Sequence, residues 1–110
     1  MLEDTLKRLE EAVRRIESAD TEHKAELLAL LAALKSEVER LSETHGEQAR
    51  SIAGFAEVAA REATRKDRSA DLVEHSVEGL ALSSKGFEAS HPQLVETVDR
   101  ICTMLSRIGI

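Results

Sequence analysis

Apolar side chains recur every three or four positions along most of the chain, and charged side chains fill the positions between them. In the first segment, this spacing connects Leu2, Leu6, Leu9, Val13 and Ile16. Such spacing gathers the apolar side chains on one side of an α-helix, and that side must pack against another helix. We therefore predict a first helix over about residues 2–18 and a turn in which Asp20 caps the next helix.

The second segment has the most regular pattern, and it is apolar on more than one side near its start. Its stripe consists of Leu27, Leu31, Leu34, Val38 and Leu41. Leu28 and Leu30 flank this stripe, so this part should be covered by more than one neighbour. The same count continues through His45, Gln48, Ile52, Phe55 and Ala59. We therefore favour one helix over about residues 21–65.

Two features weaken the middle of this long helix. Gly46 lowers helix stability by about 1 kcal/mol relative to Ala, so a break near it, giving two helices, is the close alternative. The polar residues His45 and Gln48 lie either on a seam that sets register or oligomeric state, or on a solvated kink. The alanine-rich stretch 56–63 buries little apolar area, and we expect it to be the least secure part of the core.

Two further helices are predicted, over about residues 69–89 and 92–108. The stripe of the first includes Val73, Val77, Leu80 and Phe87, and that of the second consists of Leu94, Val98, Ile101, Leu105 and Ile108. We expect Gly109 to follow the last helix in a left-handed cap.

The sequence Ser90-His91-Pro92-Gln93 marks the start of the last helix. Ser90 and Gln93 have the spacing of a capping box. However, a residue before proline is disfavoured from helical geometry, which favours His91 as the cap and Pro92 as the first helical residue. His91 is then either a structural cap that packs against Phe87, or a pH-sensitive or ligand-contacting side chain.

Together these patterns predict a single all-α domain over residues 1–110, either a long antiparallel helical hairpin or a coiled-coil-like bundle of about four helices. A helix over residues 21–65 would span roughly 66 Å at 1.5 Å per residue. One chain of this size cannot cover such a rod on all sides. We therefore expect a homodimer in which the second copy covers the remaining apolar stripe.

Composition and charge limit the classes of partner that the chain can bind. The chain is 42% hydrophobic and 33% charged, with two Phe and no Tyr or Trp, so it has few side chains for stacking on nucleobases. Its net charge of -6 opposes binding to nucleic acid and to anionic membranes. No signal peptide or membrane-spanning stretch is predicted, and we expect a cytoplasmic protein.

Candidate chemistry is sparse. The basic group Arg61, Arg65, Lys66 and Arg68 either offsets the dipole of a helix C-terminus or contacts an anion or acidic partner. His75 and Glu78 share a helix face and have the spacing of metal ligands, but no second pair completes a site, so we expect no metal or cofactor. The lone Cys102 lies within an apolar stripe. No nucleophile elbow or phosphate-binding glycine loop is present in the sequence.

The C-terminal third carries a resemblance. The sequence FEASHPQL at residues 87–94 and the final LSRIGI resemble the end of a family of short bacterial proteins, domain of unknown function number 4404. Residues 2–41 are similar to the family's opening, in which an acidic turn separates two Leu-rich helices. The resemblance covers about two thirds of the chain, and residues 46–68 look like an insertion. It implies no activity, because the family has none assigned.

These observations predict a non-enzymatic helical interaction or scaffold protein that binds itself and another helical protein. The alternative is a small regulatory or ligand-sensing protein that uses the His91 region or the basic group.

Overall fold

The protein is described here by a computed structural model, which covers residues 2–14 and 21–109. These residues form the helices α1 (Leu2–Arg14), α2 (Thr21–Ser42), α3 (Gly46–Thr64), α4 (Ala70–Ser84) and α5 (Pro92–Gly109), with the short 3-10 helix η1 (Lys85–Phe87) before α5. No strand occurs in this part of the chain. The all-α fold is confirmed, but the bundle has five α-helices where about four were predicted.

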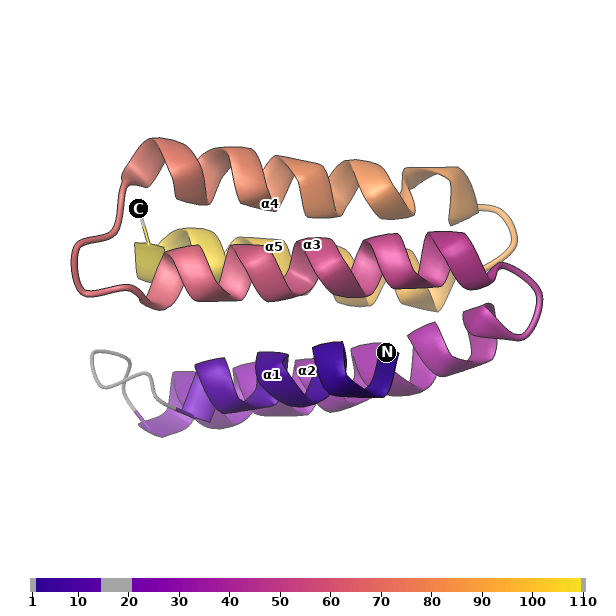
Figure 1. Cartoon of the computed structure of the whole chain (residues 1–110), viewed down its shortest axis with the longest axis horizontal. Helices are drawn as coiled ribbons and strands as arrows, with labels where there is room; N and C mark the ends of the chain where they lie inside the picture. The colour runs from indigo at the N-terminus through magenta and orange to yellow at the C-terminus, as the bar shows by residue number, and fades with distance from the viewer. Residues whose placement is uncertain (1, 15–20, 110) are drawn as a thin grey trace.

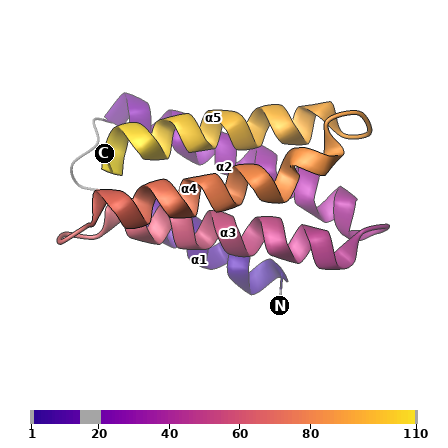
Figure 2. The same cartoon turned by 90° about the horizontal axis from the view of Figure 1, so that it is seen from above.

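The helices pack side by side in a short bundle that measures 37 × 23 × 23 Å. Successive helices run in opposite directions, with α4 along one side, α3 and α5 in the middle, and α1 and α2 along the other side (Figure 1). The view from above separates α2 and α5 from α1 and α3, which occupy opposite sides (Figure 2). Helix α3 is the central element, because it contacts each of the other four α-helices.

The favoured single helix over residues 21–65 is wrong, and the alternative of two helices is correct. The chain leaves α2 at residues 43–45, where the N–H of His45 donates to the carbonyl of Leu41 at 2.8 Å. The His45 carbonyl then accepts from Ala49 at 2.9 Å as α3 begins. Folding back at this turn lets α3 pack against α2, so both helices bury their apolar sides within one chain.

This turn also removes the premise of the predicted homodimer. No described helix approaches the predicted 66 Å, because the longest extent of the bundle is 37 Å. The apolar sides of α2 are covered by α1, α3 and α5 of the same chain, and the flanking Leu28 and Leu30 pack partly buried against the core. A second copy is therefore not needed to cover α2.

Other helix ends also differ from the predictions. Helix α1 is described only to Arg14, so residues 15–18 of the predicted helix and the predicted cap Asp20 lie outside the described residues. Helix α4 ends at Ser84, where the hydroxyl donates back to the Ala81 carbonyl at 3.2 Å, and η1 follows. Gly109 is the last residue of α5 and does not follow the helix, so its predicted position after the helix end is wrong.

The core contains most of the predicted leucines. The stripe residues Leu27, Leu31, Leu34, Val38 and Leu41 are buried, and so are Leu94, Val98, Ile101 and Leu105. Phe87 and Ile108 are only partly buried against this core. The alanine-rich stretch 56–63, expected to be the least secure part, lies in the middle of the bundle, with Ala56, Ala59, Ala60 and Ala63 fully buried; Ala49 and Ala53, earlier in α3, are also fully buried. Small side chains suit this position because α3 must contact four neighbours at once.

The predicted stripe does not continue unchanged past the turn. Ile52 and Ala59 are buried as expected, but Phe55 is 43% exposed. His45 and Gln48 are also exposed, so they do not lie on a buried polar seam. The turn changes the direction of the chain, and the buried side of α3 is set by its own neighbours rather than by the count from α2.

Candidate functional site

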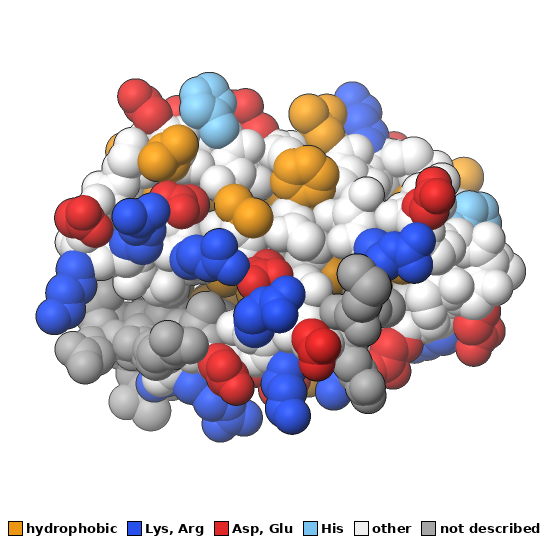
Figure 3. Space-filling view, viewed as in Figure 1, with side chains coloured by type: hydrophobic (Ala, Val, Ile, Leu, Met, Phe, Trp, Pro, Cys, Tyr) orange, Lys and Arg blue, Asp and Glu red, His pale blue; other side chains and the backbone are white. Residues whose placement is uncertain are grey.

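The most distinctive surface of the described residues is an apolar strip between α3 and α4. It consists of Phe55, Val58 and Leu72, which we call the α3–α4 strip; their exposed fractions are 43%, 42% and 50%. In the space-filling view, apolar side chains gather over α3 and α4 on the face toward the viewer (Figure 3). A fourth large apolar residue, Leu82, is 68% exposed on α4. Exposed apolar side chains that gather on one face are typical of interaction sites.

Phe55 owes its position to a glycine on the neighbouring helix. A Cβ built on Gly79 would lie 2.8 Å from both Cδ1 and Cε1 of the Phe55 ring, closer than such atoms approach in real structures. The ring therefore lies directly over the bare backbone of α4. This contact also brings position 55 of α3 close to position 79 of α4 along the bundle.

Opposite charges border the two sides of the strip. Arg61 and Arg65 lie exposed on the α3 side, and Arg8 of α1 lies beyond them. The α4 side carries exposed carboxylates at Asp71, Glu74 and Glu78. In Figure 3, blue side chains interspersed with red ones lie below the apolar patch, and the upper edge carries mainly red ones.

A largely buried carboxylate ties α1 to α3 beneath the basic side. Glu57 is 8% exposed, and one of its oxygens accepts from Nε of Arg8 and from the guanidinium of Arg61, each at 2.7 Å. The hydrogen bond that Arg8 donates to Glu57, assisted by the attraction of the Glu57 charge, raises the pKa of Arg8. The side chains of both arginines are more than half exposed, whereas that of Glu57 is not. The two guanidinium groups therefore cover the Glu57 carboxylate on its solvent side.

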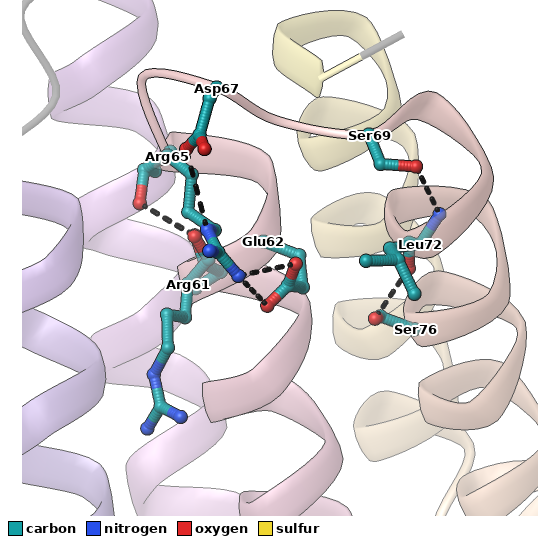
Figure 4. Close-up of polar contacts among 9 residues, drawn as sticks. Arg61, Glu62, Arg65, Asp67, Ser69, Leu72 and Ser76 are labelled. Atoms are coloured by element: carbon teal, nitrogen blue, oxygen red, sulfur yellow. Dashed lines mark hydrogen bonds and ion pairs between the residues drawn. The ribbon is translucent and has the colours of Figure 1, made fainter.

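The predicted basic group forms the end of α3 and the connection to α4 (Figure 4). Arg65 lies 3.2 Å from Glu62 and 3.8 Å from Asp67, and Arg68 donates to the Arg65 carbonyl at 3.5 Å. The Ser69 hydroxyl accepts from the N–H of Leu72 at 3.4 Å and caps α4. Since Arg61 and Arg65 already bind carboxylates, this arrangement favours the helix-end interpretation over a site for a small anion.

The structure brings His91 next to a second histidine that sequence reasoning did not associate with it. The ring centroids of His45 and Phe87 are 5.4 Å apart, those of Phe87 and His91 are 5.7 Å apart, and those of the two histidines are 6.5 Å apart. All three pairs meet edge to face. We call this group the histidine cluster; it lies where the α2–α3 turn meets the segment before α5.

The two histidines have matching local structures. The Thr44 hydroxyl lies 2.8 Å from Nδ1 of His45, and the Ser90 hydroxyl lies 2.9 Å from Nδ1 of His91. Each histidine carbonyl accepts a hydrogen bond from the residue four positions on, as at the start of a helix. The signal in the sequence was a repeated pattern, Thr44-His45-Gly46-Glu47 and Ser90-His91-Pro92-Gln93.

The geometry decides between the two caps predicted for α5. The Ser90 hydroxyl pairs with the His91 ring and not with the N–H of Gln93, so the predicted capping box does not form. The carbonyl of His91 accepts from Val95 at 3.3 Å, and α5 begins at Pro92. His91 therefore occupies the cap position and Pro92 the first helical position.

The other candidate groups are separate from one another. Nδ1 of His75 lies 3.9 Å from Glu78, and both side chains are mostly exposed. Within residues 2–14 and 21–109, no three His, Cys, Asp or Glu residues gather as metal ligands. Cys102 is 8% exposed and donates to the Val77 carbonyl at 3.6 Å. Its burial raises the pKa of the thiol from 9.0 to about 11, which makes it a poor nucleophile at neutral pH.

Two surface hollows lie away from the strip. One, of about 330 Å³, lies between α2 and α5, where Leu30 and Met104 are surrounded by charged side chains. The other, of about 310 Å³, is lined by charged residues of α1 and by Lys35. The described residues that line them include no histidine or cysteine. No helix among the described residues is both long and apolar enough to cross a membrane.

Comparison with known families gives a match over almost the whole chain. The model of a domain of unknown function, DUF4404, matches residues 2–110. The chain belongs to this family. The DUF4404 match exceeds the two thirds expected from the resemblance, and it includes residues 46–68, which looked like an insertion. No curated protein and no solved structure matches the chain.

Proposed function

We propose that this DUF4404 protein is a non-enzymatic helical interaction module that associates with a second copy of itself. The observation that carries the proposal is the α3–α4 strip. Phe55 is one of only two phenylalanines, and the bundle leaves 43% of it exposed while the leucine and alanine core is complete beneath it. Aromatic side chains supply much of the binding energy at protein interfaces, so an exposed one between two helices suits a docking surface.

The ground for self-association is therefore different from the one the sequence suggested. The strip, not an uncovered face of α2, is the surface available to a partner. The arrangement of the histidine and cysteine side chains also supports an interaction role. His45 and His91 pair with adjacent hydroxyls at helix starts, and Cys102 is buried.

Sedimentation equilibrium tests the proposal on the full chain. We expect a concentration-dependent monomer–dimer equilibrium in the micromolar range, as is typical of a modest interface. Phe55→Ala should raise the dissociation constant roughly tenfold or more, because truncating an interface aromatic costs on the order of 1–2 kcal/mol. Phe87→Ala is the matched control, since it removes the other phenylalanine from the far end of the bundle. A wild-type monomer up to millimolar concentration contradicts the proposal.

A second candidate function is favoured by the histidine cluster. It is a small regulatory or ligand-sensing protein in which His45 and His91 respond together to a bound ion. The support is their pairing around Phe87, with both Nδ1 atoms held by neighbouring hydroxyls. Hydroxyls at Nδ1 leave Nε2 of each ring for a ligand.

Imidazole NMR resonances during titration with Zn²⁺ and with inorganic phosphate test this candidate. Sensing predicts that both rings shift together and that His45→Ala abolishes the response of His91. A purely structural cap predicts no ring response, lower thermal stability for His91→Ala, and rescue by His91→Asn, because asparagine is a good cap.

A further inference from the structure

The register between α3 and α4 fixes where the charges beside the strip lie along the bundle. The Phe55 ring reaches Gly79, so positions 55 and 79 lie within about one helical turn of each other along the bundle, and the two helices run in opposite directions. Position 63, between Arg61 and Arg65, is therefore level with Asp71. Position 56 is level with Glu78. Position 56 is next to Glu57, the residue to which the guanidinium of Arg8 donates a hydrogen bond. Each of these acidic residues of α4 thus has a basic counterpart at the same level, but across the strip and on the same face.

We propose that two copies dock through their α3–α4 strips around a two-fold axis parallel to the helices. This inference rests on the proposed self-association and specifies its geometry. Such an axis keeps each residue at its own level and exchanges the two sides of the strip. Helix α3 of one copy then faces α4 of the other, apolar strip meets apolar strip, and the basic row meets the acidic row twice.

The charges exclude the other simple two-fold arrangement. An axis across the helices, within the docking plane, would place α3 on α3 and bring the basic rows of both copies together. Like charges in direct contact across an interface oppose association. The parallel axis is therefore the arrangement that the charge pattern favours.

The same pattern favours a second copy over an unrelated helix. A partner must present an apolar centre with an acidic border on one side and a basic border on the other, at matching levels. This chain itself presents that surface. The broad side of the molecule measures 37 by 23 Å, and a standard interface buries about 800 Å² on each partner, so the charged rows must take part with the strip.

Charge reversal in two separate variants tests the geometry. Arg65→Glu alone sets carboxylate against carboxylate twice in its own homodimer, and Asp71→Lys alone sets cation against cation twice. In a mixture, one contact of the heterodimer joins the two reversed side chains and the other joins the native Arg65 and Asp71, so both contacts are again attractive. We expect each variant alone to dimerise roughly tenfold more weakly than wild type, and the equimolar mixture to recover to within about threefold.

Arg107→Glu is the matched control, because Arg107 is also an exposed cation at the C-terminal end of a helix, on α5. It should leave dimerisation unchanged, and circular dichroism checks that each variant keeps its helix content. If reversal hinders folding, the neutral variants Arg65→Gln and Asp71→Asn provide a second measurement. Each should weaken dimerisation several-fold, because each removes one partner from both of the attractive contacts.

The outcomes separate the inference from the function it rests on. A dimer that neither reversed variant weakens, a mixture that does not recover, or neutral variants that dimerise as tightly as wild type overturn the two-fold geometry and leave self-association standing. A wild-type protein that stays monomeric overturns both.

Discussion

The ring of Phe55 lies against the backbone of Gly79, at a place where any larger residue would collide with it. Gly54, on the same helix as Phe55, has open space where its Cβ would be. In a helix interior, replacing Gly by Ala stabilises by roughly 1 kcal/mol. We expect Gly54→Ala to show this gain in urea unfolding. Gly79→Ala should show less than the gain or a net loss, because the added methyl must displace the ring.

The double variant Phe55→Ala/Gly79→Ala isolates this contact. Without the ring, the methyl at position 79 has room, so Gly79→Ala should now stabilise by about as much as Gly54→Ala. An equal effect of Gly79→Ala with and without the Phe55 ring would contradict the contact.

A second prediction concerns the central helix. Ala60→Leu adds three carbon atoms at a fully buried position of α3 and should destabilise the bundle by about 1–3 kcal/mol. Ala33→Leu, on the exposed side of α2, is the control and should change the free energy of unfolding by less than about 0.5 kcal/mol. Chemical denaturation with matching m-values measures both. Similar costs at the two positions would show that α3 is not closely surrounded.

A third prediction concerns the buried carboxylate of Glu57. Either Arg8→Ala or Arg61→Ala leaves one guanidinium on Glu57, so each single change should lower the free energy of unfolding only slightly. The double variant leaves the carboxylate without a cation, and should cost about 1–3 kcal/mol more than the sum of the singles. Additive costs would show that solvent, and not the arginines, stabilises the charge. Arg100→Ala, which removes an ion pair with the exposed Glu96, is the control.

A fourth prediction follows from the Cys102 thiol. Its pKa is raised from 9.0 to about 11 by burial, so between these values the unfolded chain loses this proton while the folded one keeps it. The protonated thiol therefore contributes fully to the free energy of unfolding below about pH 9. As pH rises to about 11, this contribution falls by on the order of 2 kcal/mol. The difference in unfolding free energy between wild type and Cys102→Ala, measured across this range, should show the decline. A constant difference would mean that the thiol is accessible to water.

The sequence predicted the features that depend on local spacing. The leucine stripe of α2, the apolar stripe of α5 and the start of α5 at Pro92 all follow from neighbouring residues and proline geometry. The turn after Ser42 was predicted only as an alternative to one long helix, because the spacing of three and four residues continues across it. Spacing records which residues can share a side of a helix, but not whether the chain reverses between them.

The candidate surfaces were missed for a different reason. Phe55 falls on the stripe that continues the count from residues 27–41, but its exposure depends on α4, where Gly79 lies against one side of the ring and 43% of the residue stays exposed. The pairing of His45 with His91 depends on two turns, 46 residues apart, meeting at one end of the bundle. Both relationships join distant segments, so neither has a local signal.

The buried alanines of α3 set the distance between this helix and the four α-helices around it. A change in the length of a surface side chain affects one contact, but a longer side chain on the inner sides of α3 must push several helices outward together. We therefore expect DUF4404 sequences to diverge on the outward positions of α1 and α4, while the positions of the six buried alanines of α3 stay restricted to glycine, alanine, serine and cysteine. The family's variability would then increase from the middle of the bundle toward its rim.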